Sequence, residues 1–472
     1  MTASVGSPAH PLRVAVIGAG PAGFYTVDAL FKQYDLSVEV DMYNRFPTPY
    51  GLVREGVAPD HPSIKAVTRV FDRIGADDRF RFFGHVTVGR DITVEELRGY
   101  YHAIVYAVGA QSDRKLGIPG EDLEGSHPAT IFVGWYNGHP ECADLSFDLS
   151  HPRAVVVGNG NVAVDVARIL VRDPGELAVT DIADHALVAL VESGVREVVM
   201  LGRRGPAQAK FTSAELKEFG QMDNLDVRVA PAQLELDEES RAIAEAERRV
   251  SRNLEILDDF AGRGPSNRER SIELRFFTSP VEIIGDDGRV TAVRVETNRL
   301  EPGPDGRMRA VGTGETETID CGLVLRSVGY RGVALPGAPF DAARGVIPSV
   351  AGRVTEAPGG PVRPREYAVG WIKRGPSGII GTNKPDAVET VQAIVDDVAT
   401  WGADDFPGLD PDPGAPLTLL LSRGVPVVTF EDWGRLDAAE QARGEADGRP
   451  RCKIVRVEEM LRVSGVEAPA VD

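Results

Sequence analysis

The stretch Val14-Ala-Val-Ile-Gly-Ala-Gly-Pro-Ala-Gly23 constrains the fold of this chain more than any other. Its four leading apolar residues predict a buried parallel strand, and residues 24–34 predict a helix. Between them, Gly18 permits a tight turn, Gly20 lets the backbone approach a pyrophosphate, and Gly23 lets the helix pack closely on the strand. The pattern therefore predicts a dinucleotide, with its pyrophosphate over the helix N-terminus, where free N–H groups favour an anion.

The second predicted strand, residues 37–42, ends differently from the usual dinucleotide pattern. An acidic residue normally follows, about 20 residues after the last glycine, and binds a ribose hydroxyl. Here the strand ends in Tyr43-Asn44-Arg45, and Asp41 lies within the strand. Asn44 can still hydrogen-bond a hydroxyl, but it brings no charge.

A second fingerprint, residues 154–165, has glycines at 158 and 160 and the tolerated Ala163 at the third position. A strand over 197–201 then leads into Gly202-Arg203-Arg204-Gly205. Two arginines at this point are the expected device for a 2′-phosphate, which favours NADP over NAD. A solvated basic turn is the alternative interpretation.

Other segments predict elements from their periodicity. Helices are expected over 63–74, within the charged stretch 236–270 and over 386–401, with strands over 80–88, 103–109 and 320–328. Three blocks, 274–277, 281–284 and 290–296, alternate like antiparallel strands.

Composition excludes several classes of protein. The 472 residues carry a net charge of −19, which argues against general nucleic-acid or membrane-surface binding. No apolar run reaches about 18 residues, and the first residues lack a basic region and an apolar core, so neither a membrane span nor a signal peptide is expected. The three cysteines are far apart and form no CxxC, which disfavours a disulfide framework, a cysteine metal site or a dithiol redox centre and favours the cytoplasm.

The order of the two fingerprints predicts an α/β architecture of two Rossmann-like dinucleotide-binding domains, one inserted into the other. We expect residues 1–116 and 330–472 to form the first domain, with helices at the C-terminal end, and residues 117–329 to form the inserted NADP domain. Two dinucleotides imply electron traffic, in which a nicotinamide supplies a hydride and FAD accepts it.

Several longer motifs are more discriminating than the fingerprints. They are Pro47-Thr-Pro-Tyr-Gly-Leu-Val-Arg54, Gly56-Val-Ala-Pro-Asp-His-Pro62, Gly158-Asn-Gly-Asn-Val162, Gly202-Arg-Arg-Gly-Pro206 and Gly370-Trp-Ile-Lys-Arg-Gly-Pro-Ser-Gly-Ile-Ile-Gly-Thr-Asn-Lys384. On these motifs the chain, from Val14 to about Thr390, resembles the ferredoxin–NADP reductases of the adrenodoxin reductase type, especially their bacterial cytosolic members.

The resemblance implies contacts to both cofactors. For FAD it implies Ala22, Leu52, Val88, Trp371, Gly378, Ile379 and Ile380, beside the glycine turn. For NADP it implies Arg114, Asn159, Gly160, Asn161, Val162, Arg203, Arg204, Glu215 and Gly378. The family usually has a glutamate where Asn44 stands, a departure that concerns the strength of the adenosine-ribose contact and not the presence of FAD.

His61 and Glu215 match a histidine and a glutamate that lie near the nicotinamide and the flavin in the family. Hydride transfer needs no general base, so we expect both residues to position the rings and tune the charge around them. The alternatives are a histidine that only braces its loop and a carboxylate that only favours the start of its helix, capped by Thr212 or Ser213.

The resemblance implies that NADPH reduces FAD and that single electrons then pass to an iron–sulfur ferredoxin. The alternatives are an NADPH–quinone or dye reductase without a protein partner, and a flavin subunit of a larger complex. Such subunits carry cysteines near the N-terminus, whereas the first cysteine here is Cys142. Because ferredoxins are typically acidic, we expect a local basic patch for docking at Arg268, Arg270 and Arg275; a solvated face balanced by neighbouring glutamates is the alternative.

Overall fold

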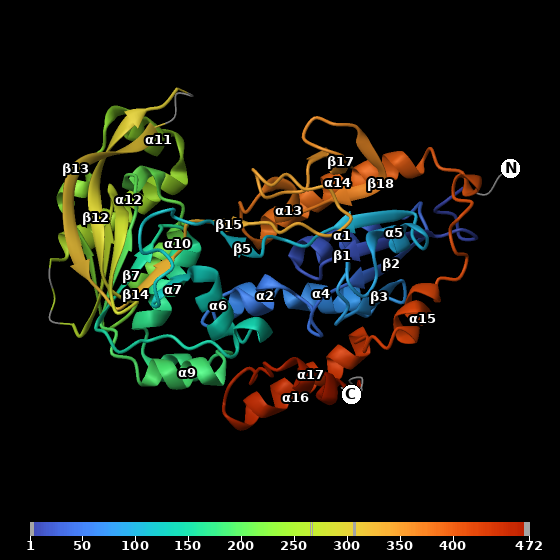
Figure 1. Cartoon of the computed structure of the whole chain (residues 1–472), viewed down its shortest axis with the longest axis horizontal. Coiled ribbons are helices and arrows are strands. Elements are labelled where there is room, and N and C mark those ends of the chain that lie inside the picture. Colours follow the sequence, from blue (N-terminus) through green and yellow to red (C-terminus); the bar gives the residue numbers. More distant parts are fainter. Residues whose placement is uncertain (1–3, 265, 267, 305–307, 467–472) are drawn as a thin grey trace. The chain divides into compact units, whose positions relative to one another are not determined.

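The computed structural model describes residues 4–264, 266, 268–304 and 308–466. The chain divides into two units (Figure 1). The first comprises Met1–Val57, His61–Ser112 and Gly329–Asp472, and the second comprises Ala58–Asp60 and Asp113–Val328. Where the chain leaves and re-enters the first unit, in the short strands β5 (Ser112–Asp113) and β15 (Tyr330–Arg331), the Ser112 hydroxyl donates to the Arg331 carbonyl oxygen at 3.0 Å.

A seven-stranded sheet forms the centre of the first unit, in the order β16-β17-β18-β4-β1-β2-β3. Its five strands from β18 to β3 pair in parallel, while β16 and β17 are antiparallel additions. The bounds are β1 Leu12–Ile17, β2 Val38–Tyr43, β3 Phe80–Phe83, β4 Ala103–Tyr106, β16 Ser349–Val350, β17 Arg353–Thr355 and β18 Val362–Ala368. The first fingerprint therefore lies on a central strand, at the carboxyl edge where parallel sheets bind ligands.

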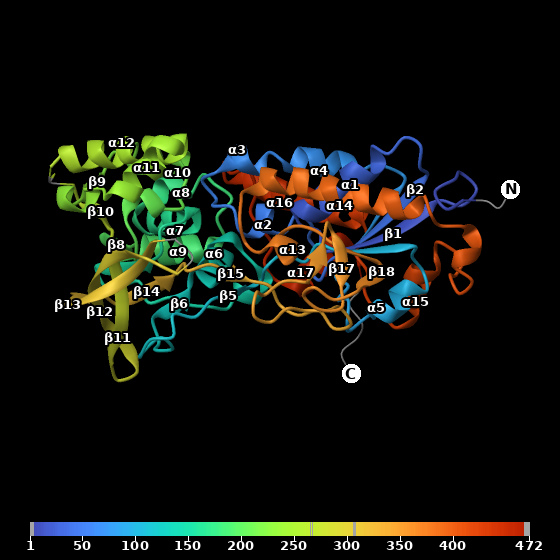
Figure 2. The same ribbon diagram turned by 90° about the horizontal axis from the view of Figure 1, so that it is seen from above.

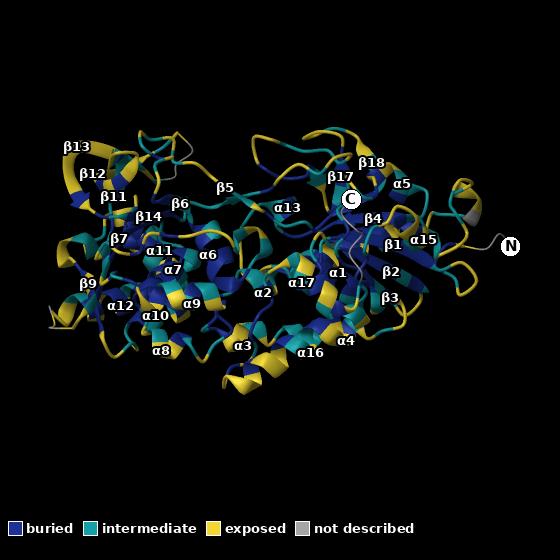
Figure 3. Cartoon of the chain, turned by 60° about the horizontal axis from the view of Figure 1, so that its bottom comes forward, coloured by how far each residue is buried: buried dark blue, intermediate teal, exposed yellow. Residues whose placement is uncertain are grey.

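Alternate residues of β1 divide the first unit's core in two. Val14 and Val16 face one cluster, and Ala15 and Ile17 face the other, so all four are buried (Figure 3). The helices are α1 Pro21–Phe31, α2 Leu52–Glu55, α3 Pro62–Lys65, α4 Thr68–Gly75, α5 Val94–Arg98, α13 Trp371–Arg374, α14 Asn383–Val398, α15 Ala415–Ser422, α16 Phe430–Ala446 and α17 Val457–Ser464. Figure 2 shows α1, α4, α14 and α16 gathered on one side of the sheet, where they supply the first cluster.

The second unit has a six-stranded sheet of order β6-β14-β7-β8-β10-β9, parallel throughout. Its strands are β6 Ser126–Pro128, β7 Arg153–Val157, β8 Glu197–Leu201, β9 Leu225–Val229, β10 Arg270–Arg275 and β14 Leu323–Arg326. A three-stranded meander, β11 Thr278–Asp286, β12 Arg289–Pro302 and β13 Met308–Asp320, packs its apolar side chains against β7 and β8.

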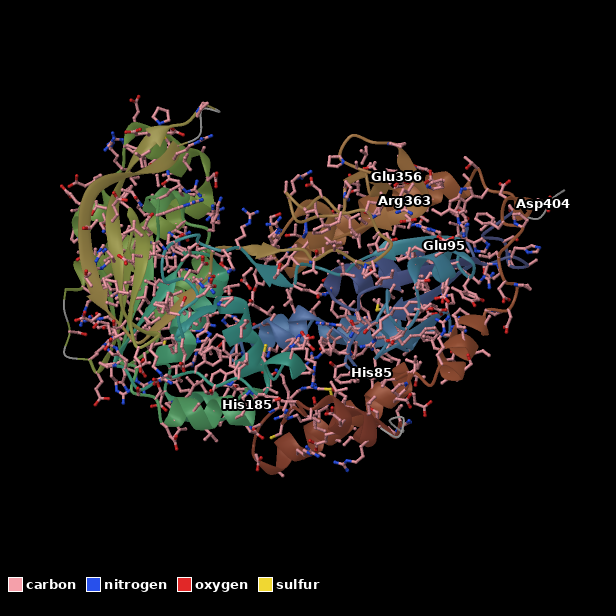
Figure 4. The ribbon with its side chains drawn as sticks, in the orientation of Figure 1. His85, Glu95, His185, Glu356, Arg363 and Asp404 are labelled. Carbon is pink, nitrogen blue, oxygen red and sulfur yellow. The ribbon has the colours of Figure 1, made fainter. Side chains whose placement is uncertain are left out.

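The helices of the second unit are α6 Ala129–Asn137, α7 Asn161–Val171, α8 Pro174–Leu177, α9 Asp184–Val191, α10 Ser213–Phe219, α11 Glu238–Ala246 and α12 Arg248–Gly262. His185 of α9, labelled in Figure 4, ties this helix to α6, because its Nε2 lies 2.9 Å from the Trp135 carbonyl oxygen. No helix in the described ranges is long and apolar enough to cross a membrane.

Three predictions of local structure are wrong. The helix over 63–74 is divided into α3 and α4, because Val67 and Val70 bond to carbonyls three residues back and the α-helical ladder lapses. The strand over 80–88 ends at Phe83, because His85 has φ +60° and leaves the extended region. Leu274 lies in β10 between β8 and β9 in a parallel sheet, since local alternation does not specify a strand's partner.

Candidate functional site

The first glycine turn joins β1 to α1 with space for a ligand. Gly18 has φ +112°, and a Cβ there would lie 2.5 Å from the Ala107 carbonyl oxygen. At Gly23 a Cβ would lie 2.2 Å from the Gly18 oxygen, whereas at Gly20 it would meet no atom of the described residues within 4 Å. No side chain in the described part of the chain caps α1, and the first turn of α1 has no acidic residue. The free N–H groups and the open space at Gly20 fit a pyrophosphate.

The second glycine turn, between β7 and α7, repeats this geometry within the other unit. Gly158 has φ +132°, and a Cβ there would lie 2.2 Å from the Ser327 oxygen. At Gly160 the nearest atom of any described residue would be 4.0 Å away. No side chain among these residues caps α7, and its first turn has no acidic residue. Asn159, Asn161 and Val162 are half-buried beside it.

The backbone beyond β8 presents two arginines. Asn298 donates to the Arg203 carbonyl at 2.9 Å, and the Phe277 amide donates to the Arg204 carbonyl at 3.1 Å. Arg203 is exposed and Arg204 half-buried, and within the described residues neither guanidinium has a hydrogen bond or an ion pair. Burial lowers the pKa of Arg204, and the adjacent Arg203 lowers it further. Two adjacent cations without a carboxylate fit a phosphate.

The Asn44 side chain is hydrogen-bonded to nearby backbone groups. Its Nδ2 donates to the carbonyls of Phe46 at 3.0 Å and Thr48 at 2.9 Å, and its Oδ1 accepts from the Ala19 amide at 3.3 Å. The side chain therefore joins the end of β2 to the first glycine turn, with one lone pair of Oδ1 left for a ligand hydroxyl.

Apolar side chains lie exposed around the first glycine turn's unit. Leu52 at the start of α2 is 37% exposed, and Ile379 after Gly378 is 61% exposed. Trp371 stacks obliquely on Tyr330, with ring centroids 5.1 Å apart, and donates to the Ser377 carbonyl at 3.1 Å. Exposed apolar groups beside a polar cradle suit a flat, hydrophobic ring system.

The remaining residues expected on the FAD side differ in exposure. Ala22 is buried, and a Cβ added at Gly370 would lie 2.6 Å from the Ala22 Cβ, so these segments touch. Val88 is buried in the core cluster behind the sheet, and Ile380 is half-buried. In the second unit, Arg114 is exposed and makes no side-chain hydrogen bond or ion pair with any described residue.

Glu215 lies in the first turn of α10, within a buried cluster of charges. The Thr212 hydroxyl caps this helix, accepting from the Glu215 amide at 3.4 Å. Arg168 of α7, which is 0% exposed, approaches Glu215 at 3.6 Å, Glu218 at 3.1 Å and Asp165 at 2.8 Å. It also contacts Asp60 at 2.7 Å.

Sequence reasoning missed Arg168, although one signal was available. The residue lies on the apolar stripe of α7, with Val164 four residues before and Val171 three residues after, where a charge needs a buried partner. Burial alone would lower the pKa of Arg168, but Asp60, Asp165 and Glu218 raise it above its ordinary value. Arg172 adds a second cation to Asp60, at 2.6 Å.

His61 follows Asp60 and belongs to the first unit, whereas Glu215 belongs to the second. The His61 side chain is buried, and its carbonyl accepts from the amides of Ile64 and Lys65 at 3.2 and 3.3 Å. The backbone of His61 therefore starts α3.

The three arginines of the expected docking patch have different surroundings. Arg268 donates to the Leu225 carbonyl at 2.5 Å, and Arg270 donates to the Val171 carbonyl at 2.8 Å. Neither contact cancels the charge. Arg275 instead pairs with Glu273 at 2.7 Å and with Glu317.

Comparisons with known proteins extend over nearly the whole chain. Residues 12–204 match the family described as pyridine nucleotide-disulphide oxidoreductase. The chain is 48% identical over 464 residues to the NADPH-ferredoxin reductase FprA of Mycobacterium tuberculosis, covering 96% of this chain and 99% of the relative. It is 44% identical to the mitochondrial NADPH:adrenodoxin oxidoreductase of Bos taurus, covering 96% and 92%. Mycobacterium tuberculosis FprA in complex with NADPH superposes with a TM-score of 0.91 at 47% identity, over 96% of this chain and all of the other.

Proposed function

Since this chain belongs to the ferredoxin–NADP reductases of the adrenodoxin reductase type, we propose that it takes a hydride from NADPH and delivers single electrons to an iron–sulfur ferredoxin. FAD supplies the chemistry between the two, because it accepts an electron pair and releases electrons one at a time. The observation that carries the proposal is the pair of open glycine turns, one in each unit. The second is followed by Arg203 and Arg204, whose guanidinium groups pair with no described residue.

The first unit binds FAD. The α1 N-terminus at Gly20 receives the pyrophosphate, and the free lone pair of Asn44 accepts from a ribose hydroxyl. The exposed side chains of Leu52 and Ile379 and the half-buried Trp371 cover the ring system and exclude water from it.

The second unit binds NADPH. The α7 N-terminus at Gly160 receives the pyrophosphate, and Arg203 and Arg204 hold the 2′-phosphate with charge-assisted hydrogen bonds. Arg114 adds a third cation from a separate segment of this unit. His61 and Glu215 position the reacting rings and set the charge around them, without an obligatory proton transfer.

Replacing both Arg203 and Arg204 by alanine tests the NADPH site. A hydrogen bond to a charged group contributes about 1.5–3 kcal/mol, so the KM for NADPH should rise at least tenfold for each arginine that binds phosphate. The KM for NADH should change little. Arg294→Ala, which removes an exposed arginine paired with Glu282 in the same unit, is the control. A double variant that keeps its preference for NADPH would place the phosphate elsewhere.

Ferredoxin is the proposed acceptor, docking at Arg268, Arg270 and Arg275, and the three free thiols fit the reducing cytoplasm proposed as its location. The deciding experiment measures NADPH-dependent reduction of the host's own ferredoxins by the FAD-loaded protein, beside a quinone and ferricyanide. Fast reduction of a ferredoxin supports the proposal. Turnover with the quinone and none with any ferredoxin would favour the NADPH–quinone reductase instead.

A further inference from the structure

A strained turn in the first unit lies directly against the glycine turn that receives FAD. Tyr50 has φ +84° and Gly51 has φ +49°. The Tyr50 amide donates to the Ala19 carbonyl at 2.8 Å, and a Cβ added at Gly51 would lie 3.0 Å from the Gly20 Cα. A non-glycine residue keeps a positive φ only where its surroundings hold it there.

Arg54, one helical turn beyond this strained turn, is held by the C-terminal part of the chain. Its guanidinium makes a two-pronged ion pair with Glu440 of α16, with Nη1–Oε2 at 2.8 Å and Nη2–Oε1 at 2.5 Å. The Arg54 side chain is 5% exposed and that of Glu440 0%. The planar fork of an arginine on a carboxylate fixes orientation as well as distance.

Further donors from the same region complete the coordination of this pair. The Ile454 amide donates to Glu440 Oε1 at 2.8 Å, and Arg451 donates to Oε2 at 3.2 Å. Lys453 donates to the Arg54 carbonyl at 3.1 Å. Burial raises the pKa of Glu440, but Arg54 and Arg451 together hold it below its ordinary value, so the carboxylate is ionised.

The same C-terminal helix contacts the strained residue itself. Trp433 of α16 donates from Nε1 to the Tyr50 hydroxyl at 3.3 Å, and the two rings meet edge to face with centroids 5.7 Å apart. The Tyr50 hydroxyl in turn donates to Asp72. Both ends of the segment 50–54 are therefore fixed by residues more than 370 positions away, as the separations of 383 and 386 residues show.

We propose that Glu440 is a positioning residue for FAD, which acts through Arg54 to hold the Tyr50–Gly51 turn against the first glycine turn. The C-terminal segment 430–454 thereby determines how tightly FAD is retained. A buried ion pair is not needed for stability alone, because apolar side chains of similar volume usually serve as well. Its use here fits a need for fixed geometry. The inference rests on the proposed function in one respect, that the first unit binds FAD.

The test compares Glu440→Gln with Glu445→Gln, the same chemical change at an exposed position of the same helix. FAD affinity is measured by titrating the apoprotein and following flavin fluorescence, and NADP affinity is measured separately. We expect Glu440→Gln to bind FAD roughly tenfold or more weakly, because it leaves the Arg54 charge buried and its fork incomplete. Its affinity for NADP, which the other unit binds, should not change, and Glu445→Gln should match the unaltered protein in both.

A folded Glu440→Gln protein with unaltered FAD affinity would overturn the inference. If that variant does not fold, Arg54→Met/Glu440→Leu is used instead, because it removes both charges and keeps apolar packing. This double variant should fold and still bind FAD weakly. Unaltered FAD affinity in the double variant would also overturn the inference. The unsubstituted protein offers a third measurement. Coupling is reciprocal, so FAD should slow hydrogen exchange of the amides in 430–454, and equal exchange with and without FAD would refute the coupling.

These outcomes separate the two proposals. Unsubstituted protein that binds no FAD would defeat the proposed function. Unsubstituted protein that binds FAD, with variants that bind it equally well, would defeat only the role of Glu440.

Discussion

Asn44 occupies a position where the dinucleotide pattern has a carboxylate, and its contacts show what replaced it. Its amide nitrogen donates hydrogen bonds to the carbonyl oxygens of Phe46 and Thr48, and an ionised carboxylate has no hydrogen to donate. The residue therefore braces the turn over 46–48 that follows β2.

Placing a glutamate at position 44 should accordingly weaken FAD binding. In Asn44→Glu both donated hydrogen bonds are lost, at about 0.5–1.5 kcal/mol each, and a negative charge faces two carbonyl oxygens. We expect a weaker FAD affinity and a lower unfolding midpoint in urea, with Asn44→Gln milder because it keeps the donor. Tighter FAD binding in Asn44→Glu, with unchanged stability, would show that the ribose contact dominates.

His102 gives the first unit a pH dependence of known sign. Its Nδ1 accepts from the Arg13 amide at 3.0 Å, so the folded protein needs the neutral ring. Burial, and then Arg13 and Arg365, lower the pKa of His102 to about 4. Unfolded, the ring titrates near 6.5, so between about pH 6.5 and pH 4 the unfolded state binds more protons.

The free energy of unfolding should therefore fall as pH drops through that window, by up to about 3 kcal/mol from this residue. The measurement is a urea unfolding series at several pH values on the protein and on His102→Gln, which does not titrate. The difference between the two curves should grow with pH across the window. A constant difference would mean that His102 keeps an ordinary pKa in the fold.

The strands that were predicted correctly are those that a local sequence pattern encodes. Strands β1 and β8 were predicted within a residue or two at each end, because a short run of buried apolar residues next to a glycine turn has few other solutions. The predicted α/β class with Rossmann-like domains is confirmed. Strand β13 was not predicted, because its side chains are mostly exposed and pairing with β12 specifies it.

The candidate site was predictable to the same extent and for the same reason. Each glycine turn, and the pair of Arg203 and Arg204, lies within a short stretch of sequence, so residue spacing alone predicts them. Arg168 pairs with Asp60, 108 residues away, and Arg54 pairs with Glu440, 386 residues away. The sequence around each arginine gives no indication of these distant partners. Only the presence of a charge on an apolar helix face pointed to Arg168.

Helix α7 carries a testable consequence of its buried charge. Arg168→Met leaves the carboxylates of Asp60, Asp165, Glu215 and Glu218 without their shared cation. Breaking a buried pair in this way costs about 3–5 kcal/mol. We expect a large loss in the free energy of unfolding and weaker NADP binding. Arg172→Met, at a more exposed cation of the same helix end, should cost less, and equal costs for the two variants would contradict a central role for Arg168.

The net charge of the protein opposes its association with an acidic partner. A net charge of −19 repels an acidic ferredoxin at long range. Mobile ions confine surface charges to about 8–10 Å at ordinary salt, so a local cationic patch is sufficient for docking. Many arginines are paired with carboxylates, as Arg363 is with Glu356 at 3.5 Å (both labelled in Figure 4). Cations without such partners therefore stand out as docking candidates.

Arg268 and Arg270 meet this condition, because they donate only to carbonyl oxygens in the described contacts, whereas Glu273 and Glu317 offset Arg275. Reversing all three to glutamate should slow ferredoxin reduction at low salt roughly tenfold, through the association rate. Most of the loss should come from Arg268 and Arg270.

Ferricyanide is the internal control for that experiment, because a small acceptor needs no docking patch and the flavin site is untouched. A variant with the same net charge, in which three exposed arginines elsewhere in the second unit are reversed, controls for the effect of net charge; suitable positions are Arg241, Arg294 and Arg299. Raising the salt concentration should bring the ferredoxin-reduction rates of the docking variant and the unaltered protein closer together, since screening weakens both attraction and repulsion. Ferredoxin reduction that responds neither to the reversals nor to salt would exclude this patch, because an electrostatic docking step must respond to both.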